Sequence, residues 1–281
     1  MHFGFIGAGK VGFSMGKYLT ERGEKVTGYC SRSVSSAREA AAFTGSAAYD
    51  SMRALVQECD AVFVTVPDGA IVSVWEELRL LPISDKRIIH CSGALSSAVF
   101  SDIRQTSACG YSIHPLLAVN DKFSSYQDFD RAFFTIEGDE RYLEELRGLF
   151  TGFGNTVAVI SAEHKVLYHT AAAAASNLCV GLIRMSEDLL CECGFSPENA
   201  HKALSPLILG NMQNIVQYGT AQALTGPIER NDVATVRKHL AALSGDEREI
   251  YRLLSGQVLK AAKERHPGRD YQTMEGELNR L

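Results

Sequence analysis

A lysine and a histidine stand four residues apart near the middle of the sequence, Lys165 and His169. On a helix this spacing places both side chains on one face, one turn apart. An ammonium group can polarise a carbonyl, and an imidazole beside it can protonate the alkoxide that hydride addition creates. Ser176 continues this face and Asn177 follows it, so both are further polar candidates. The alternative is a helix that links two domains and carries a solvated lysine and histidine.

A glycine fingerprint begins the sequence. The run Gly7-Ala8-Gly9-Lys10-Val11-Gly12 lies between an apolar stretch, residues 3–6, and a helical pattern, residues 11–22. In this context the first glycine permits a tight turn, the second lets a pyrophosphate approach the backbone, and the third lets the helix pack on the strand. The N–H groups at the start of the helix then face the phosphates. The run predicts a dinucleotide site; the alternative is an ordinary glycine-rich turn.

The end of the next predicted strand, residues 25–30, indicates which dinucleotide binds. A cofactor with a free ribose 2′-hydroxyl usually meets an acidic residue about 20 residues beyond the fingerprint. Here the sequence has Ser31-Arg32-Ser33 and no carboxylate. A guanidinium between two hydroxyls suits a 2′-phosphate. We therefore expect NADP(H) rather than NAD(H), the alternative being a solvated arginine.

Three other predicted strands end in small or rigid residues. Because ligands of open α/β sheets bind beyond the carboxyl ends of the strands, these residues are expected at the cofactor cleft. His114, which precedes a proline, is a substrate-binding candidate, although a structural histidine explains it equally well. Turn formation explains Asp68 and Ser92 as well as cofactor binding does. The cofactor candidates at the first two strand ends are Val66, Pro67, Asp68, Cys91, Ser92 and Gly93.

A later polar loop contains Thr225-Gly226-Pro227, which interrupts a helical pattern. Arg230 in this loop can bind a substrate carboxylate in a bidentate contact, or can belong to a simple turn between helices. For Asp232 we favour the cap of the next helix.

Length, charge and cysteine content limit the class of protein. A chain of 281 residues is long enough for two domains. Its formal net charge of −5 gives no reason to expect nucleic acid as a partner. The seven irregularly spaced cysteines are typical of reduced thiols in a cytoplasmic protein and do not form a metal-binding pattern. We expect no metal, no signal segment and no apolar run of membrane-spanning length.

Hydrophobic patterns divide the chain into two domains. Apolar strands alternate with helices up to residue 161, which predicts an α/β Rossmann domain with a doubly wound parallel sheet. Residues 162–281 are predicted to form an all-α domain, with a loose polar tail after Pro267. The predicted strands are residues 3–6, 25–30, 61–66, 87–91, 110–113, 132–136 and 156–160. The predicted helices are residues 11–22, 71–81, 140–150, 162–193, 197–218, 233–243 and 247–266.

This organisation resembles the 6-phosphogluconate-dehydrogenase-like superfamily, which includes β-hydroxyacid dehydrogenases, ketopantoate reductase, pyrroline-5-carboxylate reductase and deazaflavin-dependent NADP reductase. His114-Pro115, residues 165–177 and residues 224–232 look like a bacterial group of Rossmann-like NADP-binding oxidoreductases with a C-terminal domain of unknown function. By this resemblance Lys165 matches the catalytic lysine of β-hydroxyacid dehydrogenases. Those enzymes have an asparagine one turn later, where this chain has His169. The resemblance also implies a homodimer formed through the C-terminal domain.

The residues and the resemblance together predict an NADP(H)-dependent oxidoreductase that reduces a small, keto acid-like carbonyl compound. Lys165 would polarise the carbonyl oxygen and His169 would supply the proton, with substrate between the domains. Two alternatives remain open: a non-catalytic NADPH-binding sensor or scaffold, and a reductase of cyclic imines.

Overall fold

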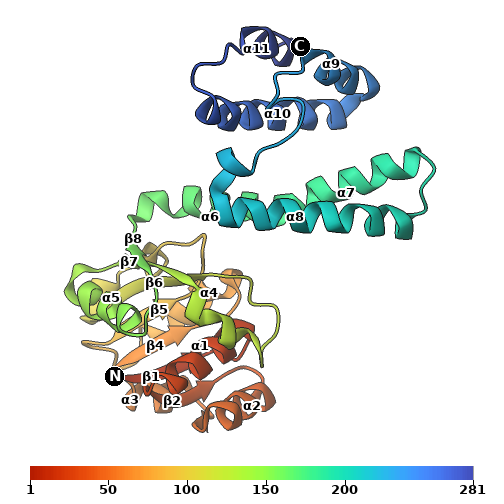
Figure 1. The fold of residues 1–281 in the computed structure, drawn as a ribbon. Helices are drawn as coiled ribbons and strands as arrows, with labels where there is room; N and C mark the ends of the chain where they lie inside the picture. Colours follow the sequence, from red (N-terminus) through yellow and green to blue (C-terminus); the bar gives the residue numbers. More distant parts are fainter. Residues whose placement is uncertain (281) are drawn as a thin grey trace. The chain divides into compact units, whose positions relative to one another are not determined.

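The computed structural model describes residues 1–280, which form two compact units, residues 1–176 and residues 177–280. The first unit is built on one eight-stranded sheet with the order β3-β2-β1-β4-β5-β6-β7-β8 (Figure 1). Neighbouring strands are parallel, except that β6 and β7 are antiparallel. The strands are β1 (His2–Ile6), β2 (Lys25–Cys30), β3 (Ala47–Tyr49), β4 (Ala61–Val64), β5 (Arg87–His90), β6 (Cys109–Leu116), β7 (Phe133–Gly138) and β8 (Val157–Val159).

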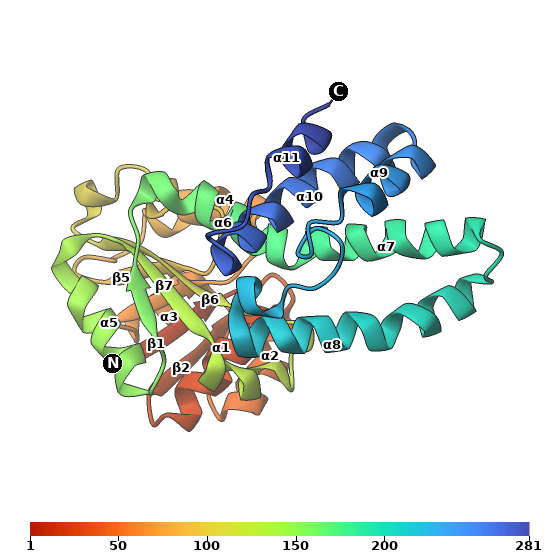
Figure 2. The same cartoon turned by 45° about the horizontal axis from the view of Figure 1, so that its top comes forward.

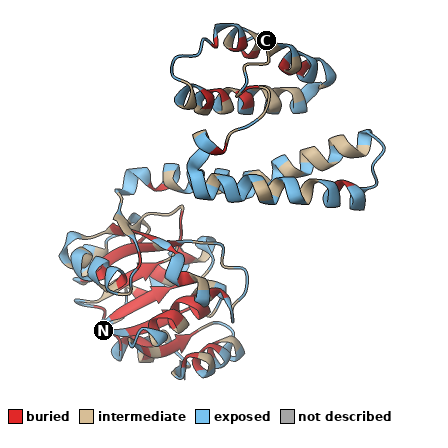
Figure 3. Cartoon of the chain, viewed as in Figure 1, coloured by how far each residue is buried: buried red, intermediate tan, exposed pale blue. Residues whose placement is uncertain are grey.

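Helices cover both faces of this sheet, which confirms the doubly wound Rossmann prediction. One apolar cluster joins the sheet to α1 (Lys10–Glu21), α2 (Val34–Thr44) and α5 (Leu143–Gly152). A second cluster joins the opposite face to α3 (Met52–Gln57) and α4 (Asp68–Leu78), with Trp75 fully buried in it. Both faces therefore exclude water, as a parallel sheet requires. The buried strands stand out in Figure 3.

The remaining short elements of the first unit are 3-10 helices. Their bounds are η1 (Ser97–Val99), η2 (Ile103–Thr106), η3 (Ser125–Arg131), η4 (Glu140–Tyr142) and η5 (Ala162–His164). The last of these leads into α6 (Lys165–Ala175), so a helix follows the sheet within the same compact unit. This unit extends to Ser176, whereas the sequence placed the boundary at residue 161, where the strands end. The difference arises because Lys165 is buried against the sheet.

The second unit is helical, as predicted. Its elements are α7 (Asn177–Glu192), α8 (Pro197–Ala223), α9 (Val233–Ala242), α10 (Gly245–Arg265) and α11 (Gln272–Leu278). The last three helices and the segment before α9 share a small core that includes Ile228, Leu259 and Met274. The prediction of a loose tail after Pro267 is wrong, because Tyr271, Met274 and Leu278 are buried in this core. Asp232 caps α9 by accepting a hydrogen bond from the Thr235 backbone, as expected.

The helices α7 and α8 form an antiparallel hairpin with little core of its own (Figure 2). No residue of α7 is buried, and in α8 only Ala200 and Ala223 are. Large apolar side chains of the hairpin, including Leu178, Val180, Leu207 and Val216, are instead exposed.

The expectation that no apolar run reaches membrane-spanning length is wrong. The helical stretch 162–192 contains a window that is long and apolar enough to cross a membrane, judged by length and composition only. A predicted single helix over residues 162–193 is likewise divided, because Ser176 separates α6 from α7. None of the residues in that apolar window is buried.

Candidate active site

The first and third glycines of the fingerprint, Gly7 and Gly12, are required by close packing on Thr65. Gly7 has a φ of +105°, and a methyl group on it would lie 2.8 Å from the backbone oxygen of Thr65. A methyl group on Gly12 would lie 2.6 Å from Thr65 Oγ1, the hydroxyl that donates a hydrogen bond to the Gly7 carbonyl. Larger residues therefore cannot replace either glycine without moving β1, α1 or the end of β4.

Gly9 differs because it leaves open space. It is the N-cap residue of α1, makes no side-chain cap, and would carry a methyl group no nearer than 3.8 Å to other atoms. The first N–H groups of α1 are therefore available to an anion, and the helix dipole favours negative charge at this end. The exposed Lys10 stands at the start of the same helix, and Ala8 and Val11 complete the turn. This geometry fits the pyrophosphate of a dinucleotide.

The segment Ser31-Arg32-Ser33 lies at the carboxyl end of β2, where the ribose of a dinucleotide is expected. Ser33 caps α2, because its hydroxyl accepts a hydrogen bond of 3.3 Å from the Ser36 backbone N–H. Arg32 is exposed, as a residue that binds a phosphate from solvent must be. Its guanidinium is therefore the charged group of this segment that a 2′-phosphate can use.

The ends of β4 and β5 are joined by a hydrogen bond. Ser92 Oγ donates to Asp68 Oδ2 over 2.7 Å and accepts from the backbone N–H groups of Ala94 and Leu95. Turn formation is thus one role of this pair. Val66 and Pro67 lie in the same turn, which leads into α4. Burial raises the pKa of the Cys91 thiol to about 12, so this cysteine stays protonated at neutral pH.

Lys165 anchors α6 to the sheet. Its side chain is 1% exposed, and Nζ donates to the backbone oxygen of Ser92 over 3.0 Å and to Ser112 Oγ over 2.8 Å. The Ser112 hydroxyl itself donates to the same Ser92 oxygen over 3.1 Å. Burial lowers the pKa of Lys165, while the nearby carboxylate of Glu137 opposes that effect. A buried cation is thereby placed at the adjoining ends of β5 and β6.

Two imidazoles meet at Gly93, one residue beyond the Ser92 carbonyl. A methyl group on Gly93 would lie 2.9 Å from His114 Nε2 and 2.8 Å from His169 Cδ2. His114 belongs to β6 and its Nδ1 lies 2.7 Å from the hydroxyl oxygen of Tyr168 on α6. Burial, together with the charge of Lys165, lowers the pKa of His114 to about 4. His114 is therefore neutral at physiological pH.

The structure thus brings together five predicted residues from three separate stretches of sequence: Ser92, Gly93, His114, Lys165 and His169. Sequence reasoning missed Ser112 and Tyr168. Ser112 lies two residues before His114, so both side chains point to one face of β6. Tyr168 lies three residues after Lys165, a spacing that places helical neighbours on one face. Both signals were present in the sequence but are common in any strand or helix.

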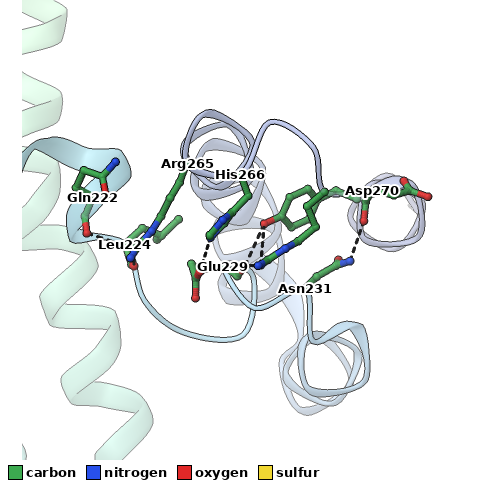
Figure 4. A network of polar contacts seen from close by, with 9 residues as sticks. Gln222, Leu224, Glu229, Asn231, Arg265, His266 and Asp270 are labelled. Carbon is green, nitrogen blue, oxygen red and sulfur yellow. Dashed lines mark hydrogen bonds and ion pairs between the residues drawn. The ribbon is translucent and has the colours of Figure 1, made fainter.

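The other candidates lie where the first unit ends or within the second. Ser176 is the last residue of the first unit, Asn177 begins α7, and all three of Ser176, Asn177 and Arg230 are exposed. The loop that carries Arg230 is held to the end of α10 (Figure 4). Glu229 contacts His266 over 2.6 Å, and Arg265 donates a hydrogen bond to the Gln222 carbonyl over 3.2 Å. This network fixes the loop and leaves Arg230 exposed.

Comparison with known proteins agrees with the cofactor geometry. Residues 2–92 match the family described as NADP oxidoreductase, coenzyme F420-dependent. The first unit carries an NADP oxidoreductase domain. Residues 132–258 match a domain of unknown function, DUF2520. The chain is therefore an NADP-dependent oxidoreductase with NADP(H) as its cofactor, and the two matched domains are those that its motifs predict. A comparison with curated proteins gives no match.

Solved structures share the fold of this oxidoreductase. Protein TM1727 from Thermotoga maritima is 27% identical, with a TM-score of 0.73, and the similarity covers 93% of this chain and 98% of that one. A pyrroline-5-carboxylate reductase from Coxiella burnetii is 16% identical with a TM-score of 0.58, covering 93% and 97%. An imine reductase variant from Myxococcus stipitatus in complex with NAD+ is 18% identical with a TM-score of 0.59, covering 99% and 98%.

Proposed function

We propose that this oxidoreductase reduces a small, keto acid-like carbonyl compound at the carboxyl ends of β5 and β6. The observation that carries the proposal is the arrangement around Gly93, where two imidazoles adjoin a buried ammonium. Hydride addition to a carbonyl produces an alkoxide, which needs nearby positive charge and a proton. Both requirements are met by residues of the first unit.

Bound NADPH supplies the hydride. In this proposal the N–H groups at the start of α1 hold its pyrophosphate, and Arg32 holds its 2′-phosphate. The nicotinamide end of the cofactor is assigned to Cys91-Ser92-Gly93, because ligands of open α/β sheets bind beyond the carboxyl ends of the strands and this segment follows β5.

Lys165 contributes its charge rather than a direct contact. Two of its donors are already engaged by Ser92 and Ser112, and its side chain is buried. A fixed cation behind the Ser92–Gly93 turn stabilises negative charge that develops on the other side of that turn, and low surrounding polarity strengthens the effect. An imidazole, from His114 or His169, then delivers the proton.

Three further polar residues, Arg230, Ser176 and Asn177, are candidates for binding a carboxylate. Arg230 is exposed on a loop that the network of Figure 4 holds in place, so its guanidinium is available for a bidentate contact. Ser176 and Asn177 are exposed next to α6, the helix that carries the reaction site. They are candidates for hydrogen bonds to the substrate.

We also propose a homodimer formed through the second unit. The hairpin α7–α8 exposes large apolar side chains along both helices and buries almost none of its residues (Figure 3). An exposed apolar surface of this extent usually marks an interface. A second copy supplies the same apolar surface in return, which is the arrangement of a two-fold dimer. The seven cysteines form no disulfide within the described residues 1–280, which supports a reducing, cytoplasmic location.

The test is NADPH oxidation, followed by absorbance, with 2-keto acids, 3-keto acids, short aldehydes, cyclic imines and coenzyme F420. Lys165→Ala is assayed beside the parent, and NADPH binding is measured for both. We expect turnover of a keto acid that falls at least 100-fold in the variant while NADPH binding is retained. Turnover of imines that is insensitive to the substitution would identify an imine reductase. Tight NADPH binding without any turnover would contradict the proposal in favour of a sensor.

A further inference from the structure

His114 and Tyr168 form a half-buried pair whose geometry is more restricted than that of a contact on the protein surface. The two rings are nearly perpendicular, with centroids 5.6 Å apart, and the hydroxyl oxygen of Tyr168 lies 2.7 Å from Nδ1 of His114. Both side chains are half-buried, one on β6 and the other on α6. The two elements are held together by the hydrogen bond from Lys165 to Ser112, on the same strand as His114. The pair is therefore fixed from both sides.

The charges around His114 keep its ring neutral. Lys165 and His169 on α6 and His90 on β5 disfavour a second positive charge, and only the Asp68 carboxylate on α4 favours one. Tyr168 is the remaining titratable neighbour, and burial raises the pKa of its hydroxyl, so it too is neutral. A neutral imidazole carries a single N–H, whose position depends on the partner of the other nitrogen.

We propose that Tyr168 donates its hydroxyl proton to Nδ1 of His114, and that the resulting Nε2–H of His114 is the group that protonates the substrate oxygen. Nε2 is the nitrogen that faces Gly93. His114 is then a catalytic residue and Tyr168 a positioning residue that fixes its tautomer. This inference rests on the proposed carbonyl reduction and names the proton donor of that reaction.

The proton transfers balance without a further reactant. When the carbonyl carbon receives a hydride, the π electrons of the C=O bond become a lone pair on oxygen. That oxygen forms a bond to the Nε2 proton while the N–H bond breaks, and Nδ1 takes the hydroxyl proton of Tyr168. Nε2 then recovers a proton from water, and the Nδ1 proton returns to the tyrosinate, which restores the starting tautomer. The Lys165 ammonium, 5.5 Å from the centre of the Tyr168 ring, stabilises the transient negative charge.

His169 is less well placed for this role. It is exposed, and within residues 1–280 the structure gives its ring no hydrogen-bond partner. Its tautomer and orientation are consequently not fixed, whereas a proton donor works best when both are. We assign His169 to contact with the bound substrate rather than to proton transfer.

The experiment combines catalysis with a direct view of the histidine. Tyr168→Phe removes the hydroxyl and keeps the ring, and His114→Gln removes the imidazole. Tyr142→Phe is the matched control. Tyr142 follows β7, which is antiparallel to β6, so it lies beyond the starting end of β6 whereas His114 lies near the other end. Within residues 1–280 the hydroxyl of Tyr142 has no hydrogen-bond partner. The readouts are kcat for the active carbonyl compound, NADPH affinity, and the nitrogen chemical shifts of the His114 ring in the protein without cofactor.

We expect kcat to fall about 100-fold or more in His114→Gln and at least about tenfold in Tyr168→Phe, with NADPH affinity kept. The parent ring should be protonated at Nε2 alone at pH 7, and Tyr168→Phe should produce a mixture of tautomers. Tyr142→Phe should change neither readout.

A parent ring protonated at Nδ1, or Tyr168→Phe with the kcat of the control, would overturn the inference while leaving carbonyl reduction intact. A larger loss in His169→Gln than in His114→Gln would assign the proton to His169 instead. If the parent reduces no compound at all, the proposed function fails and the role of His114 fails with it, whatever its tautomer.

Discussion

The two units differ in how far their large apolar side chains are buried. In the first unit, both faces of the sheet are covered, and its largest side chains, such as Trp75 and Phe63, are fully buried. In the second unit, the α7–α8 hairpin leaves Leu207 and Val216 exposed at 68% and 88%. The first unit thus has the core of an independent domain, whereas the hairpin lacks one.

The residues proposed for catalysis and the surface proposed for dimerisation lie in different units. The cofactor fingerprint, the buried lysine and both imidazoles belong to the first unit, where they rest on a closed core. A precise arrangement of catalytic groups needs such rigid support. The hairpin instead exposes an apolar surface, and we propose that a second copy of the chain binds there.

The strongest test of the comparison removes one large side chain from each unit. Trp75→Ala creates a cavity in a closed core and should lower the free energy of unfolding by about 3–5 kcal/mol. Val216→Ala removes a side chain that is exposed within the single chain, so at a protein concentration at which sedimentation detects only monomer it should lower the free energy of unfolding by less than about 0.5 kcal/mol. Denaturant unfolding followed by circular dichroism measures both. Equal losses would show that the hairpin has a core like that of the first unit.

Low pH should lower the free energy of unfolding of the first unit, because its buried histidines resist protonation. Burial lowers the pKa of His90 to about 4, against an ordinary value of 6.5. Between these values the unfolded chain binds a proton that the folded chain excludes, so stability is complete above pH 6.5 and is lost as pH falls toward 4. The loss amounts to at most about 3 kcal/mol for this residue. Fluorescence of the single tryptophan reports the first unit, and His90→Gln should flatten the pH dependence. An unchanged slope would contradict this origin.

A charge introduced on the hairpin should weaken the dimer, whereas a charge introduced on the surface of the first unit should not. Leu207→Asp places a carboxylate on the hairpin and should weaken the dimer about 100-fold, because an interface core excludes unpaired charge. Leu80→Asp is the control, since Leu80 is 77% exposed on the first unit and belongs to no proposed interface. Sedimentation velocity from 1 to 100 μM measures the dimer. A parent protein that is monomeric at all these concentrations would contradict the proposed homodimer.

A second measurement tests the apolar window of residues 162–192 with lipid vesicles. Binding of the parent protein to the vesicles would indicate a membrane as the partner of that window.

The smallest expected effect is on the choice between NADPH and NADH, which we attribute to residues of the first unit alone. Arg32→Asp replaces the cation at the end of β2 by an anion. It should weaken NADPH binding about 10- to 100-fold and leave NADH binding within about threefold, because only NADPH carries the 2′-phosphate. Fluorescence titration with both cofactors measures the difference. If both affinities fall equally, Arg32 does not bind the 2′-phosphate.

The first unit could be predicted from sequence because its signals are local. The sequence places the strand Lys25–Cys30 residue for residue, because the turn residues Gly23 and Ser31 stand close to its two ends. The same is true of the fingerprint, whose glycines have one physical explanation each. By contrast, α2, β3 and α3 were not predicted individually, and β3 has only three residues.

Tertiary contacts account for what the sequence could not reveal. The burial of Lys165 depends on Ser92 and Ser112, which are distant in sequence and meet only when β5 and β6 pair. The partnership of His114 with Tyr168 has the same cause. In the tail, Met274 and Leu278 are buried although their surroundings are polar, because α10 provides the opposing surface. The hydrophobic pattern of a single segment does not reveal which distant residues its side chains will contact.

The most direct test of the account is the transfer of deuterium from NADPH labelled at C4 of the nicotinamide to a keto acid. Both labelled stereoisomers of the cofactor are incubated with the full-length protein and each 2- or 3-keto acid, and the hydroxy acid is examined by mass spectrometry. We predict a product one mass unit heavier from one stereoisomer, and its loss in Lys165→Ala with NADPH still bound. NADPH that binds tightly but never delivers its label to any of these compounds would contradict the account.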